Sequence, residues 1–76
     1  MAARTQVHVV YKDSLWRVEV VGEFAARSTH AVKAEAVKEG RRVGKSLVPS
    51  ELYIHNMDGT IAERETYGND PYPPIG

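Results

Sequence analysis

The chain has 76 residues, no cysteine, and ten basic side chains balanced by ten acidic ones. A chain of this length forms one small domain with a modest core, and without cysteine it has neither disulfides nor thiolate metal clusters to stabilise it. The composition, with 42% hydrophobic and 26% charged residues, is that of a globular domain. No apolar run is long enough for a membrane span or a signal peptide, so we expect a soluble cytoplasmic protein.

Two segments near the N-terminus, residues 7–12 and 15–21, are rich in β-branched and aromatic side chains and predict a β-hairpin with Asp13-Ser14 as its turn. A two-residue turn fixes the register, which pairs Tyr11 with Trp16 and His8 with Glu19. The opposite face, with Lys12 and Arg17, is left for solvent, the tail or a partner. A short third strand is expected over residues 24–28. The face that we assign to the core carries Val7, Val9, Tyr11, Trp16, Val18 and Val20.

Residues 32–47 change to a helical period, with Val32, Ala36, Gly40, Val43 and Leu47 along one stripe. Glycines inside a helix cost about 1 kcal/mol each relative to alanine. We therefore expect Gly40 and its neighbour at position 44 to let the helix lie close to the sheet. Thr29 or His30 is expected to cap the helix, failing which its first turn frays, and a proline at position 49 closes it.

A second hairpin is predicted over residues 52–66, with a turn at 56–59. Leu52 and Ile54 complete the core, whereas Ile61 is expected to share a face with Glu63 and Glu65, which suits an edge strand protected by charge. The element order β-β-(β)-α-β-β predicts a two-layer α+β domain, one antiparallel sheet packed against a single helix. We expect a flexible N-terminus over residues 1–6, the domain over 7–66, and a proline- and tyrosine-rich tail over 67–76.

The sequence resembles the family known as domain of unknown function 2188, from bacteria and phages. The resemblance rests on His8-Val9-Val10 and Trp16-Arg17-Val18 in the strands and on residues 32–36 at the start of the helix. Its most specific part is the ending, Leu52-Tyr53-Ile54-His55-Asn56-Met57-Asp58-Gly59-Thr60-Ile61 followed by Tyr67-Gly68-Asn69-Asp70-Pro71-Tyr72-Pro73-Pro74. The resemblance implies a compact intracellular domain, and the family carries no assigned function.

No pattern in the chain indicates catalysis. The three histidines, His8, His30 and His55, lack the spacing of metal ligands, and Asp58 with the glutamates after it does not match a calcium loop. There is no nucleophile elbow, phosphate loop or dinucleotide glycine pattern. We therefore expect a protein that is not an enzyme, with no catalytic residue, no cofactor and no metal. An enzyme whose site forms only between subunits is kept as a third alternative, behind the two binding hypotheses below.

The leading functional hypothesis is a small binding module that acts through protein contacts, with an unknown partner or with itself as a homodimer. The candidate contact residues combine the charged edge strand with the tail, and they are Glu63, Glu65, Tyr67, Tyr72, Pro73 and Pro74. The alternative is a nucleic-acid-binding accessory domain, because four cations spaced i, i+3, i+4 and i+7 project from the helix opposite its apolar stripe. These cations are Lys38, Arg41, Arg42 and Lys45, and Arg17 and Lys12 are further candidates to assist them.

Overall fold

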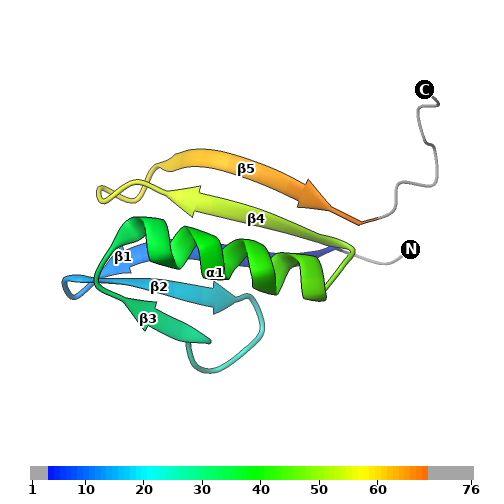
Figure 1. Cartoon of the computed structure of the whole chain (residues 1–76), viewed down its shortest axis with the longest axis horizontal. Helices are drawn as coiled ribbons and strands as arrows, with labels where there is room; N and C mark the ends of the chain where they lie inside the picture. The colour runs from blue at the N-terminus through cyan, green and yellow to red at the C-terminus, as the bar shows by residue number, and fades with distance from the viewer. Residues whose placement is uncertain (1–3, 69–76) are drawn as a thin grey trace.

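The computed structural model describes residues 4–68, which form a five-stranded sheet with one helix lying across one of its faces (Figure 1). This is the two-layer α+β architecture expected from the sequence. In chain order the elements are β1 (Thr5–Lys12), β2 (Leu15–Val20), β3 (Ser28–His30), α1 (Lys33–Ser46), β4 (Ser50–His55) and β5 (Ile61–Tyr67).

The β1–β2 hairpin has the predicted turn and the predicted register. Asp13 and Ser14 have φ of 54° and 66°, the positive values that both central residues of a type I′ turn require. All six expected cross-strand pairs are present, from Val7 with Val20 to Lys12 at the turn. The turn therefore determines which side chains enter the core.

The centre of the sheet corrects the prediction that all strands are antiparallel. The strand order is β3-β2-β1-β4-β5, and β1 and β4 run parallel, with Val7 beside Leu52 and Val9 beside Ile54. The reason lies in the connection, because α1 carries the chain from the end of β3 back to the opposite end of the sheet. The strand that follows a helical crossover runs in the same direction as the strand before it.

The third strand also differs from the prediction, since it covers Ser28–His30 and not residues 24–28. Residues 21–27 form a loop in which the side chain of Phe24 is fully exposed, at 105% of its reference accessibility. The loop is closed by Arg27, whose guanidinium donates two hydrogen bonds of 2.8 Å to Glu23 and whose backbone N–H donates to the carbonyl of Val18. Strand pairing begins only after this closure.

The N-cap of helix α1 lies two to three residues after the expected caps. Its N-cap is Val32, which has extended backbone and makes no capping hydrogen bond with its side chain, so neither Thr29 nor His30 serves. Val32 is also exposed, and its place at the start of the core stripe was predicted wrongly. The helix is held by the burial of its apolar face and not by a cap.

The core lies between α1 and the sheet. A Cβ atom added at Gly40 would lie 2.7 Å from Cγ2 of Val9, so the close approach inferred from the helical glycines is present. Tyr11 and Leu47 are only partly buried at the margin of the core, because they lie beside the ends of α1. The buried apolar residues are Val7, Val9, Trp16, Val18, Val20, Ala36, Val43, Leu52 and Ile54.

The domain extends beyond its expected boundaries at both ends. β1 begins at Thr5, and the side chain of Arg4 donates a hydrogen bond of 2.9 Å to the carbonyl of Tyr67. Tyr67 is the last residue of β5 and not the first residue of a tail. Residues 4–6 and 67 are therefore part of the folded unit.

Candidate functional site

The first candidate surface is the outer edge of β5. This strand of seven residues pairs with β4 on one side, and no strand within residues 4–68 pairs with its other side (Figure 1). A bulge lies at its start, so that Ile61 pairs with His55 while Glu63 pairs with Ile54. The expectation that Ile61 shares a face with both glutamates is therefore wrong. The expected edge strand protected by charge is present.

The two glutamates of β5 lie on the side of the sheet that α1 covers, where they meet Arg41. The Arg41 guanidinium contacts Glu65 with an Nη2–Oε2 distance of 2.7 Å, and Glu63 lies further away at 3.9 Å. The hydrogen bonds from Arg41, together with one from Tyr67, lower the pKa of Glu65. The side chain of Glu63 is 61% exposed. Glu63 is therefore the carboxylate that the strand edge offers to solvent.

The side chain of Tyr67 makes its contacts within the domain. Its ring packs so closely against α1 that a Cβ atom at Gly44 would lie 2.9 Å from Cδ2 of the ring. The ammonium of Lys45 lies 5.9 Å from the ring centroid, and the hydroxyl donates to Glu65. Burial and this hydrogen bond raise the pKa of Tyr67 to about 12. Tyr67 was predicted to contact another protein, but its ring packs on the surface of α1 around Gly44.

The four helix cations do not form one free basic face. Arg41 and Lys45 turn toward β5, while Arg42 forms a two-pronged ion pair with Glu39 on the helix. Lys38 lies on the other flank and lines a shallow hollow together with Arg42, Glu39 and His30. All four are exposed on the side of α1 away from its buried residues, as predicted, but the long side chains of Arg41, Arg42 and Lys45 extend sideways toward carboxylates and a ring.

The uncovered face of the sheet carries a row of three rings that sequence reasoning missed. His8 stacks on Tyr53 with centroids 4.8 Å apart, and its Nδ1 lies 2.9 Å from Nε2 of His55. The Nδ1 atom of His55 lies 3.1 Å from the carbonyl of Gly59, which accepts only, so we assign the His55 proton to Nδ1. Its Nε2 then accepts the hydrogen bond from Nδ1–H of His8. His55 is thus bonded both to His8 on β1 and to the turn that precedes β5.

This arrangement has an electrostatic consequence for His8. Burial is the main cause that lowers its pKa, and the nearby His55 lowers it further, against an opposing contribution from Glu19. The predicted pairing of His8 with Glu19 is present in the strand register, but the hydrogen bond goes to β4. In the sequence, only the alternation of apolar and polar residues along both strands indicates this contact. That alternation can be interpreted only when β1 and β4 are known to be neighbours.

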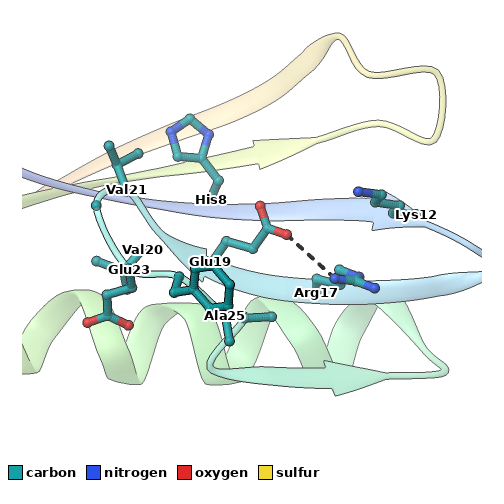
Figure 2. A pocket seen from close by; sticks show the side chains of 11 residues that line it. His8, Lys12, Arg17, Glu19, Val20, Val21, Glu23 and Ala25 are labelled. Atoms are coloured by element: carbon teal, nitrogen blue, oxygen red, sulfur yellow. Dashed lines mark ion pairs between the residues drawn. The ribbon is translucent and has the colours of Figure 1, made fainter.

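A hollow of about 510 Å³ lies on the same uncovered face, where the β2–β3 loop rises beside the sheet (Figure 2). Its lining includes Lys12 from β1, Arg17 and Glu19 from β2, and Val21 and Phe24 from the loop. The guanidinium of Arg17 lies 4.0 Å from Glu19, and its Nε is buried without a hydrogen-bond partner. Sequence reasoning placed Arg17 on this face but could not foresee the loop that borders it.

The remaining candidates concern the tail, metals and membranes. The predicted contact residues Tyr72, Pro73 and Pro74 lie outside the described residues. Within residues 4–68, no group of three or more histidine or acidic side chains is arranged to hold a metal ion. The helix in this part of the chain lacks the length and the apolar character needed to cross a membrane.

Fold and surfaces together define a small α+β domain in which one helix covers a mixed five-stranded sheet, leaving a charged strand edge and a polar sheet face uncovered. Residues 7–67 match the model of a family described as an uncharacterised protein conserved in bacteria, DUF2188. The chain therefore belongs to this family. Neither the curated proteins nor the solved structures contain a match.

Proposed function

We propose that this protein is a non-enzymatic binding module that receives an extended segment of a partner protein along the outer edge of β5. The observation that carries the proposal is the seven-residue edge strand at the border of the five-stranded sheet. The outer side of such a strand presents backbone N–H and C=O groups, which an added strand can satisfy. The opposite edge strand, β3, has only three residues and offers a much shorter template.

The edge is also held in place before a partner arrives. Arg41 links Glu65 to α1, and the ring of Tyr67 packs on Gly44, so the strand is attached to the helix layer at two points. A preorganised strand loses less conformational freedom when it binds, which favours affinity. The same contacts occupy Arg41 and Lys45, and this supports protein contacts over the nucleic-acid alternative, in which these cations would bind phosphates.

The charge pattern of β5 indicates which partner fits. Consider two copies of the chain that pair through antiparallel β5 strands, with both helices on the same side of the joined sheet. A register centred on the charged residues 63–65 places Glu63 opposite a glutamate and Arg64 opposite an arginine. Like charges directly opposite each other destabilise a pair. The edge therefore favours an extended partner segment with a basic residue opposite Glu63 and a neutral or acidic residue opposite Arg64, and it disfavours a homodimer through this strand.

We propose a cytoplasmic setting for this binding, which suits a chain without cysteine. The test uses two synthetic peptides of β-forming residues that span β5, one with lysines and one with glutamates at alternate positions. Amide resonances of ¹⁵N-labelled protein are followed during titration. The lysine peptide should bind more tightly and shift residues 61–67, and a copy with N-methylated backbone should not bind.

The charge dependence is tested with Glu63→Lys, which should reverse the preference between the two peptides by about two- to fivefold in each direction, as for exposed ion pairs. Glu35→Lys on the exposed side of α1 makes the same charge change away from the edge and should leave the preference unchanged. Binding of neither peptide, or shifts centred away from β5, would contradict the proposal. Sedimentation that shows a dimer disrupted by Glu63→Lys would replace it with self-association.

A further inference from the structure

The uncovered sheet face contains an arginine whose hydrogen-bonding capacity is unused. The closest carboxylates to the Arg17 guanidinium are those of Asp13 and Glu19, at 3.9 and 4.0 Å, which is too far for hydrogen bonds. Its Nε is buried without an acceptor. By contrast, Arg27 and Arg41 each hold a carboxylate with nitrogen–oxygen distances between 2.7 and 3.1 Å. Arg17 thus lacks the oxygen partner that these arginines have.

Arg17 lies in a hollow and has a second cation, Lys12, as its neighbour. Arg17 pairs with Val10 across the hairpin while Lys12 pairs with Leu15, so the two cations are diagonal neighbours on one face of the sheet. Figure 2 shows both side chains at the same end of the hollow, with His8 at the other end. The volume of about 510 Å³ is within the range of small-ligand sites.

We propose that this hollow binds an oxyanion, a carboxylate or phosphate group, with Arg17 as the anchor and Lys12 as a second charge. The planar guanidinium presents paired N–H donors that match two oxygens of such a group. The site is separate from the edge of β5, since Arg17 lies on β2 and Lys12 on the central strand β1, and neither strand pairs with β5.

The apolar lining of the hollow adds a second property. Val21 and Phe24 are exposed at 62% and 105%, and both line the hollow, with Val21 at the end away from the two cations (Figure 2). An apolar body that extends from the oxyanion along the hollow would cover these side chains and remove apolar surface from water. The ligand that fits the site best is therefore an organic anion and not a bare inorganic ion.

Glu19 opposes this binding and provides the sharpest test. Its carboxylate is 41% exposed and lines the hollow next to Arg17. Glu19→Gln removes a competing negative charge without changing the shape of the side chain. An anion site should therefore gain affinity by about two- to fivefold in this variant, the size of a weak exposed charge interaction.

The experiment titrates the full ¹⁵N-labelled chain with sodium phosphate, acetate and benzoate at constant ionic strength, and follows the Nε–H resonance of Arg17. Saturable shifts at Arg17 are expected, with benzoate binding more tightly than acetate. Comparing phosphate with acetate separates phosphoryl from carboxylate ligands. The Nε–H resonance of Arg27, which already donates to Glu23, serves as the internal control and should not follow the same curve.

Arg17→Gln should lower the affinity at least about tenfold, as expected for loss of charge-assisted hydrogen bonds. Arg42→Gln makes the same change on α1 and should have no effect. Equal, linear shifts of Arg17 and Arg27, or an affinity that Glu19→Gln leaves unchanged, would overturn the proposal. The Glu19→Gln arm decides the question even if Arg17→Gln does not fold.

Discussion

The two faces of the sheet are built from the same strands, yet one is closely packed and apolar and the other carries polar and charged side chains. Toward α1 the side chains are buried and so closely packed that the helix requires glycine at its contact with Val9. On the other face the rings of His8 and Tyr53 stack beside charged groups, and Arg17 has no hydrogen-bond acceptor at its Nε. One face specifies the fold through shape, and the other is free to carry titratable and ligand-binding groups.

The largest difference between the faces should appear when neighbouring residues on β2 are truncated. Trp16 is 6% exposed on the covered face, whereas Leu15 is 38% exposed on the other. We expect Trp16→Ala to lower the free energy of unfolding by about 3–5 kcal/mol, and Leu15→Ala by about 0.5 kcal/mol or less. Urea denaturation followed by circular dichroism measures both. Similar losses for the two variants would remove the distinction between the faces.

The next effect concerns the close contact of the helix with the sheet. A side chain at Gly40 meets Val9 at 2.7 Å and Leu52 at 3.2 Å, and both are fully buried and have no room to move. Gly40→Leu should therefore destabilise the domain by about 1–3 kcal/mol, the usual cost of overpacking. Ala34→Leu adds the same side chain on the exposed side of α1 and should be close to neutral. A tolerant Gly40 would show that the helix can lift from the sheet at little cost.

On the uncovered face the expected effect depends on pH. The pKa of His8 in the fold is below its ordinary value of 6.5, so the unfolded chain binds more protons as the pH falls below that value. The contribution of His8 to stability is complete above pH 6.5 and is lost as the pH falls through the folded pKa. The free energy of unfolding should decrease on acidification in this range. His8→Gln should flatten the slope, and an unchanged slope would assign it to other groups.

The smallest expected effect on stability concerns the ionisation of Tyr67, which lies at the end of β5 beside α1. The pKa of Tyr67 is raised to about 12, so above pH 10 the unfolded chain loses this proton before the fold does. The stability that Tyr67 contributes is present below pH 10 and is lost between pH 10 and about 12. Ultraviolet absorbance should show late ionisation of Tyr67 and also of Tyr53, whose pKa is raised by its hydrogen bond to Glu51, and Tyr67→Phe should remove the part near pH 12. Ionisation near pH 10 would mean that the ring does not pack on α1.

The sequence was sufficient for the contacts made between near neighbours in the chain. The type I′ turn at Asp13-Ser14 determined the register of β1 and β2, and the spacing of Ala36, Gly40 and Val43 determined the buried side of α1. These features depend on local backbone geometry and on periodicity, which a single sequence contains. The α+β architecture followed from the order of the elements.

The features that the sequence did not reveal arise from contacts between distant segments. The parallel pairing of β1 with β4 brings His8 and His55 together, and no local pattern in either strand indicates it. The pairing of Arg41 with Glu65 likewise depends on which flank of α1 lies beside β5. Flexible charged side chains choose partners within reach, so their directions follow from the tertiary structure. The site at Arg17 depends on the path of residues 21–27, which contain no strand.

The central position of β1 has a consequence for synthesis on the ribosome. β1 is made first, and its hairpin with β2 forms from adjacent residues, but its other neighbour is β4, which emerges only after α1 has been made. Until then a strand of the sheet interior has a free edge, the kind of surface that associates with other unfinished chains. The nascent domain is therefore most exposed to aggregation between completion of the first hairpin and release of residues 50–55. Slow translation in that interval would prolong the exposure.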